Sequence, residues 1–198
     1  MNYELSIPPF ENKDYDDMTP KEARQYFKWF VNNIPNRLNM FEAKLIEEGV
    51  IKKLEFTEDM IITIWQWYES KIDTKILSEE EYKQKIEGQP DFVIPFISNW
   101  GFTEETSLYC LDIAIFFAQV FIHNHDRIHW DLVTRSKRYV YRNKPVLSGF
   151  DHNVRMHPTT IVYNMTLKTL TTGKNPLRLL EKYHFWQNCI GDEERDSL

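Results

Sequence analysis

LYCLDIAIFFAQVFI, residues 108–122, is the most apolar stretch of the chain and decides its fold. A membrane-spanning helix needs about 18 to 20 apolar residues in a row, whereas this run is shorter and contains Asp112 and Gln119. Thr103 and the two glutamates after it form a typical helix start, because a threonine hydroxyl accepts a backbone hydrogen bond and carboxylates favour the positive end of the helix dipole. The stretch therefore predicts a central core helix that ends near His123.

Helix start and stop signals predict four shorter helices before this core helix. TPKE, residues 19–22, reads as a capping box with proline in the first helical position. Pro35 is expected to end that helix, because the residue before a proline is pushed out of the helical region. Thr57 begins an aromatic-rich helix, and Ser78 with Glu81 forms a second capping box. The predicted helices span residues 20–34, 36–48, 58–72 and 79–87.

The hydrophobic period changes after the core helix. RIHWDLV, residues 127–133, alternates as a half-buried strand does, and residues 138–150 read as the returning strand, with Pro145 ending regular pairing or marking an edge. Helical spacing returns over 159–172 and again after Asn175. We therefore expect a mostly helical α+β fold, a single domain over residues 1–190 with a small antiparallel hairpin sheet at 127–150, and an acidic disordered tail over 191–198.

Charge is divided unevenly along the chain, whose net charge is −6. Residues 1–105 carry 12 basic and 21 acidic residues, a net −9, whereas residues 106–190 carry 11 and 5, a net +6. Such opposed fields can steer a charged partner or hold the two halves of one domain together. With an acidic start that lacks a secretory signal and only two cysteines, the chain is expected to be cytoplasmic, without a membrane segment, disulfide or cofactor.

HNHDRIHWD, residues 123–131, places His123, His125 and His129 within seven positions. Three imidazoles could hold a zinc or iron ion, so one alternative is a metal-dependent hydrolase that uses these histidines with Asp131. The other interpretation places His123 at a helix end, His125 in a turn and His129 on the polar face of a strand, where their rings point apart. Because no HExxH motif is present, we expect no metal here.

Polar residues also form a narrow stripe on the core helix. Glu105, Asp112 and Gln119 recur every seven residues, and His123 follows four residues later, so all four share one helix face. One interpretation is a cleft in which Asp112 orients His123 or a ligand; the other is the solvent-facing seam of a buried helix.

The predicted hairpin carries a basic, tyrosine-containing stretch, RSKRYVYRNK, residues 135–144. Arg135, Arg138 and Arg142 could grip phosphates while tyrosines stack on bases, yet no nucleic-acid-binding motif accompanies them. They could equally neutralise the acidic half of the chain or dock onto an acidic protein. His129 and Asp131, on the polar face of the first strand, complete the candidate binding residues on the hairpin.

A resemblance to known proteins rests on two stretches of the chain: LDIAIFFAQVFI, residues 111–122, and IHWDLVTRSKRYVYRNKPVLSGF, residues 128–150. They resemble a group of small bacterial proteins that pair a core helix with a hairpin ending in Pro-Val-Leu-x-Gly-Phe. Some of these look like immunity proteins, which are associated with bacterial toxins. The resemblance implies a protein partner, a toxin, and brings no catalytic residues with it.

No positive catalytic motif stands elsewhere in the chain. Gly173-Lys174 lacks the glycine loop of a phosphate-binding site, and Ser148-Gly149 lacks the pattern of a nucleophile elbow. The charge division and aromatic content favour a cytoplasmic protein-interaction module of the immunity type, contacted through the acidic helical half or the basic hairpin. The metal-dependent hydrolase and a nucleic-acid-binding hairpin are the alternatives.

Overall fold

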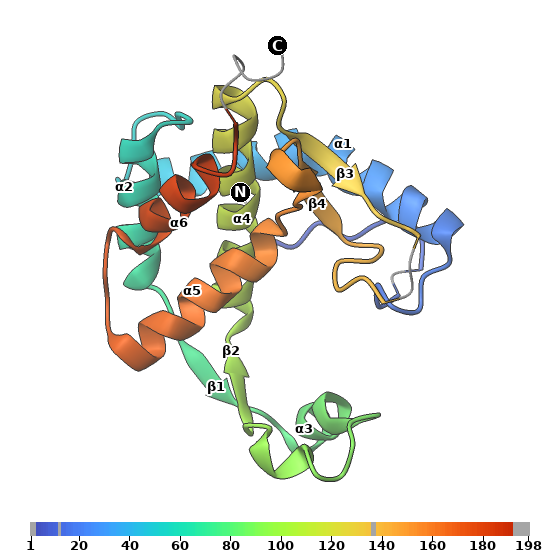
Figure 1. The fold of residues 1–198 in the computed structure, drawn as a ribbon. Coiled ribbons are helices and arrows are strands. Elements are labelled where there is room, and N and C mark those ends of the chain that lie inside the picture. Colours follow the sequence, from blue (N-terminus) through green and yellow to red (C-terminus); the bar gives the residue numbers. More distant parts are fainter. Residues whose placement is uncertain (1–2, 12, 136–137, 192–198) are drawn as a thin grey trace.

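Helix α4 (Glu104–Asn124) runs through the centre of the fold, as predicted (Figure 1). The computed structural model describes residues 3–11, 13–135 and 138–191 of the chain; the predicted tail lies outside them apart from Gly191. Although α4 is long and apolar enough to cross a membrane, 67% of its most apolar window is buried inside the fold, as expected of a core helix. The Thr103 hydroxyl caps it by accepting the Thr106 backbone N–H at 3.2 Å.

The first helix, α1 (Pro20–Glu47), is a single long helix, and the predicted break at Pro35 is wrong. The capping box at Thr19 and Glu22 is present as predicted. A proline inside a helix costs about 3 kcal/mol, but Pro35 faces solvent while one continuous stripe packs on both sides of it. The buried residues of that stripe are Ala23, Ile34, Arg37, Phe41 and Leu45. Their packing stabilises the continuous helix by more than Pro35 destabilises it.

Three further helices enclose α4. α2 (Glu58–Glu69) begins at the predicted Thr57 cap and buries the predicted inner face, including Trp65 and Tyr68. α5 (Pro158–Thr172) ends at Gly173 as expected, and α6 (Arg178–Gln187) follows. The hydrophobic core joins residues from α1, α2, α4, α5 and α6.

The predicted hairpin sheet is present but shorter than expected. β3 (His129–Leu132) pairs antiparallel with β4 (Pro145–Ser148), so Pro145 starts the returning strand rather than ending it. Leu147 also pairs with Met156, beyond the short 3-10 helix η2 (Asp151–Asn153). Buried Asn143, before β4, donates to the carbonyls of Tyr15 and Met18 at 2.8 and 2.9 Å, which ties the hairpin to the segment before α1.

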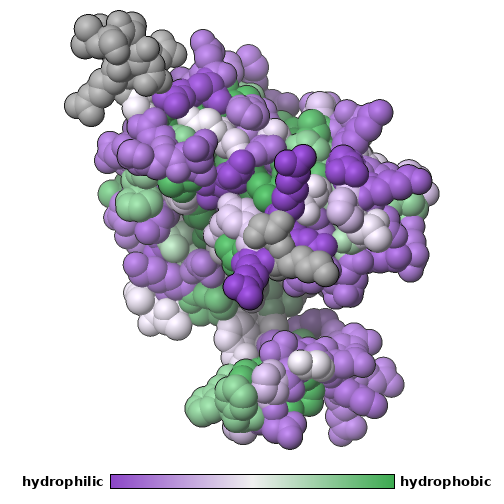
Figure 2. All heavy atoms as spheres, turned by 45° about the vertical axis from the view of Figure 1, so that its right-hand side comes forward, coloured by the Kyte–Doolittle hydropathy of each residue, from purple (hydrophilic) through white to green (hydrophobic). Residues whose placement is uncertain are grey.

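A second two-stranded sheet, which the sequence did not predict, carries a projecting lobe. β1 (Thr74–Ile76) pairs antiparallel with β2 (Trp100–Phe102), and α3 (Glu79–Ile86) and the 3-10 helix η1 (Ile94–Phe96) lie between them. We call residues 74–102 the arm. Figures 1 and 2 show it extending below the helical body on this narrow stalk. The fold is thus the predicted mostly helical α+β type, and the described residues form two small sheets instead of one.

Candidate functional site

A segment without helix or strand, residues 3–10, lies along α1 and α4, and we call it the strap. It closes over a buried ion pair: Arg37 donates to Asp112 through Nε at 2.9 Å and through Nη2. The strap adds two contacts, because the Tyr3 hydroxyl donates to Asp112 and Arg37 donates to the Glu4 carbonyl. Asp112 of the predicted site is therefore a buried partner of Arg37 and of the strap.

The electrostatics of this cluster follow from its burial. Desolvation raises the pKa of Asp112 above that of an exposed aspartate, while the hydrogen bonds from Arg37 and Tyr3 act in the opposite direction. Burial and the neighbouring Asp112 charge raise the pKa of Tyr3 far above its ordinary value, so Tyr3 stays a hydrogen-bond donor. The arrangement fixes the strap to the α1–α4 groove.

A cleft of about 780 Å³ lies where the arm meets the body. This size falls in the range of about 300–1,000 Å³ common for ligand clefts. Its lining is acidic: four glutamates, Glu4, Glu81, Glu104 and Glu105, face two lysines, Lys44 and Lys75.

Both lysines of the cleft are already paired. Lys75 contacts Glu81 at 2.6 Å and Lys44 contacts Glu48 at 3.1 Å. The Lys75 ammonium lowers the pKa of Glu81 to about 2, so that carboxylate stays ionised. The cleft thus presents net negative charge beside apolar residues of the strap and α4, an arrangement that favours a cationic group carrying some apolar surface.

The arm exposes large apolar side chains beyond this cleft. Phe92 and Phe96 are 77% and 87% exposed, and Ile76 is 72% exposed. Figure 2 shows hydrophobic side chains gathered on one side of the arm, on the lower lobe. Single exposed apolar residues are ordinary, but several on one projecting element are typical of a contact surface.

The three clustered histidines do not converge on a common point. The exposed His123 ring lies 5.5 Å from the Phe56 ring, and His125 Nε2 is 3.5 Å from the Tyr183 hydroxyl. The Nδ1 atom of His129 lies 2.9 Å from the Arg127 carbonyl. Across residues 3–11, 13–135 and 138–191, no group of three histidine, cysteine or acidic side chains is placed to hold a metal ion.

The four residues of the polar stripe on α4 differ in their exposure to solvent. Asp112 is 1% exposed, Gln119 is partly buried, and Glu105 and His123 are exposed. Glu105 accepts a hydrogen bond from Tyr109 at 2.9 Å, and Asp112 has its own partners on α1 and the strap. The four residues therefore share a helix face without forming one site.

The basic hairpin presents two of its three candidate arginines to solvent. Arg135 and Arg138 are exposed and Arg142 is half-buried, and none of them has an acidic partner within the described part of the chain. His129 is exposed on β3. Asp131 lies beside Ser148 and Arg155, accepting hydrogen bonds at 2.8 and 3.2 Å, which with the Leu132 backbone N–H hold its pKa low despite partial burial.

Two features of the site escaped the sequence analysis. Arg37 was not singled out, although it stands on the apolar stripe with Ile34 and Phe41. A basic residue on one apolar stripe and an acidic one inside an apolar helix could have predicted a buried ion pair. The arm cleft left no comparable signal, because its walls come from the strap, α1, the arm and α4.

No family model, curated protein or solved structure matches this chain.

Proposed function

We propose that the chain is a cytoplasmic protein-interaction module that binds a positively charged protein through its arm. The observation that carries the proposal is the exposure of Phe92 and Phe96, at 77% and 87%, on an element that projects from the body. Aromatic side chains that become buried at the centre of an interface supply much of its binding energy. A projecting arm brings such side chains to a partner without a clash with the body.

The charges of the arm support a basic partner. The arm carries five acidic and three basic residues. Lys75 is paired with Glu81, and Lys85 donates to the Ser98 and Trp100 carbonyls at 3.0 and 2.7 Å. Four carboxylates have no ion-pair partner among the described residues: Glu79, Glu80, Glu87 and Asp91. They would attract a basic surface toward the exposed phenylalanines.

The resemblance to immunity proteins extends this proposal. In this extended proposal the chain is an immunity protein, its partner is a toxin, and the arm covers the active surface of the toxin. The support is the resemblance of residues 111–122 and 128–150 together with the acidic arm. A captured partner that loses its toxic or enzymatic activity on addition of the chain would support this step, and a partner whose activity is unchanged would contradict it.

The two alternatives receive less support. The metal-dependent hydrolase lacks a ligand cluster within the described ranges. The basic hairpin stays available as a contact surface, because Arg135 and Arg138 are exposed, but the large exposed aromatics of the arm have no counterpart on it. We therefore place the partner on the arm.

The test is capture of a partner from cells of the source with the full chain and three variants. Phe92→Ser/Phe96→Ser removes the arm aromatics. Leu177→Ser/Phe185→Ser removes similarly exposed apolar side chains, 47% and 59% exposed, near α6. Arg138→Gln/Arg142→Gln removes two positive charges from the hairpin. We expect one basic protein to bind the wild type and the last two variants, and to bind the arm variant at least tenfold more weakly, since two aromatic anchors commonly contribute about 2 kcal/mol each.

Salt gives a second readout of the same complex. The association rate should fall as ionic strength rises and should fall further in Glu79→Gln/Glu80→Gln, because both changes weaken the attraction between acidic arm and basic partner. Binding lost only in the hairpin variant, or a partner held equally by every variant, would contradict the arm as the contact surface.

A further inference from the structure

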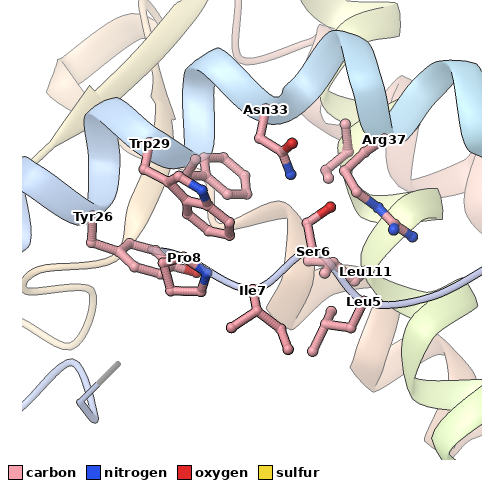
Figure 3. A pocket seen from close by; sticks show the side chains of 11 residues that line it. Leu5, Ser6, Ile7, Pro8, Tyr26, Trp29, Asn33, Arg37 and Leu111 are labelled. Atoms are coloured by element: carbon pink, nitrogen blue, oxygen red, sulfur yellow. The ribbon is translucent and has the colours of Figure 1, made fainter. Parts of the chain in front are cut away.

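A small apolar cavity lies beneath the strap, apart from the arm (Figure 3). Its volume is about 130 Å³. α1 and α4 supply most of its walls, residues 5–8 of the strap line the rest, and the cavity is partly open to solvent. The apolar residues that line it are Leu5, Ile7, Pro8, Tyr26, Trp29, Phe30, Leu111 and Ile115.

The strap leaves this cavity unfilled although it carries two aliphatic side chains next to it. Figure 3 shows Ser6 directed toward α1, whereas Leu5 and Ile7 point away from α1. Leu5 is 57% exposed and Ile7 is 80% exposed. Because neighbouring side chains of an extended chain face opposite sides, a strap that only covered the core would gain by turning Leu5 and Ile7 inward.

One end of the cavity is polar. The Asn33 side chain projects from α1 toward Ser6 (Figure 3), and its Oδ1 accepts a long bond from Asn36 Nδ2 at 3.3 Å. The amide nitrogen of Asn33 and the hydroxyl of Ser6 have no hydrogen-bond partner in the part of the chain that the structure describes. Arg37, also at this end, is committed to Asp112 and Glu4. A ligand with one polar group could therefore bond to Asn33 and Ser6.

Size and access restrict the ligand further. An apolar cavity of about 150 Å³ holds one benzene molecule, so this cavity of about 130 Å³ has the size of a single aromatic ring. The strap makes no backbone–backbone hydrogen bond within the described ranges. Among the residues that the structure describes, its attachment to the body by hydrogen bonds is confined to Tyr3 and Glu4, which bond to Asp112 and Arg37, so residues 5–7 can move while this end stays in place.

We infer that the cavity between the strap, α1 and α4 is a binding site for a p-hydroxyphenyl group. The ring packs against Trp29, Phe30 and Leu111, and the hydroxyl forms hydrogen bonds with Asn33 and Ser6. Such a group comes either as a free small phenol or as a tyrosine side chain of another polypeptide. The inference does not depend on the arm, so it can fail or succeed independently of the proposed function.

The experiment is calorimetric titration of the full chain with p-cresol, with toluene and with N-acetyltyrosinamide. We expect saturable binding of p-cresol at one site, several-fold tighter than toluene, with a rise in melting temperature as the ligand concentration increases. Binding of p-cresol alone identifies a free small phenol as the ligand, and tighter binding of the tyrosine amide identifies a side chain. The inference is overturned when neither p-cresol nor N-acetyltyrosinamide binds saturably.

Two variants locate the site. Leu111→Phe fills the cavity and should weaken p-cresol binding about tenfold or more, whereas Leu108→Phe, one turn away on α4 and facing the arm cleft, should bind it as the wild type does. Ser6→Leu fills the same space from the strap and serves if Leu111→Phe does not fold. Asn33→Ala should weaken p-cresol but not toluene. Unchanged p-cresol binding in the filled variants would place the ligand elsewhere and reject the site.

Discussion

Arg37 and Asp112 lie 75 positions apart in the chain and form a two-point ion pair between α1 and α4, with Nε 2.9 Å from Oδ1. Their side chains are 3% and 1% exposed. The pair links α1, α4 and the strap through contacts at a single point of the fold. Its removal should therefore affect stability more than any surface ion pair.

Replacement of Arg37 tests this directly. Arg37→Met leaves the Asp112 carboxylate buried without its cation, so the free energy of unfolding should fall by about 3 to 5 kcal/mol. Urea unfolding at pH 7 measures the loss. Lys75→Met, which breaks the solvent-exposed pair with Glu81, is the control and should change stability little. Equal losses in the two variants would contradict a dominant role for the buried pair.

Tyr3→Phe tests the attachment of the strap. The variant keeps the ring but removes the hydroxyl that donates to Asp112, so we expect a loss of roughly 1 kcal/mol in the free energy of unfolding and faster cleavage within residues 3–10 by a protease added to the folded chain. Limited proteolysis followed by mass spectrometry gives both the site and the rate of cleavage. Tyr163→Phe, on the exposed face of α5, should leave cleavage of the strap unchanged; a strap that is cleaved at the wild-type rate in Tyr3→Phe would refute the attachment.

His157 predicts a pH dependence of stability. Burial, with the nearby Lys144 charge, lowers the pKa of His157 from 6.5 to about 4. Because the folded-state pKa lies below the unfolded one, the neutral ring contributes stability above pH 6.5, and this contribution is lost as the pH falls toward 4. The loss is on the order of 3 kcal/mol.

A variant separates His157 from the carboxylates that titrate in the same range. The ring caps α5 by accepting the Thr160 backbone N–H at 3.2 Å, and asparagine is also a good cap. Denaturant unfolding of His157→Asn between pH 7 and pH 4 should therefore show a flatter decline than the wild type. Parallel declines would show that His157 does not carry the effect.

Gly149 should be the glycine least tolerant of a side chain among those at positive φ. Its φ is +105°, and an added Cβ would lie 2.1 Å from the Arg127 carbonyl oxygen. Gly173 has φ +80° but open space around the same position. Gly173→Ala should therefore cost about 1 to 2 kcal/mol from backbone strain alone, and thermal unfolding should show a clearly larger loss for Gly149→Ala. Similar losses of stability in the two variants would mean that the backbone near Arg127 moves to make room for the added methyl group.

Zinc addition tests the histidine cluster. His123, His125 and His129 contact different neighbours, so we expect no saturable rise in melting temperature with added zinc and no difference between the wild type and His123→Ala/His129→Ala. Stoichiometric metal in the purified native chain, lost in that variant, would restore the metal-dependent alternative.

Local signals predicted most of the helices. The capping boxes at Thr19 and Ser78, the threonine caps at Thr57 and Thr103, and Gly173 act within one turn of the chain, so their effect is visible in the sequence. Pro35 shows the limit of such reasoning. Its local preference is real, but packing of Ile34 and Phe41 on either side of it is a tertiary effect.

Non-local pairing accounts for what the sequence analysis missed. Each strand of the arm sheet is three residues long, too short for a visible alternation, and its partner lies more than twenty residues away. The strap has neither caps nor period, and its place depends on Asp112 and Arg37 together. Of the candidate residues, Asp112 was predicted only as part of a polar stripe, because its partners Arg37 and Tyr3 lie 75 and 109 positions away in the chain.

The pairing of Thr74 with Phe102 makes the arm a transplantable unit. Its entry and exit stand on adjacent strands, so the polypeptide between them can be excised and the gap bridged by a tight turn without a change in the spacing of the remaining framework. Conversely, the excised hairpin can be grafted onto the end of any exposed antiparallel ribbon. The proposed binding surface and the scaffold that displays it can thus diverge, or be engineered, as separate parts.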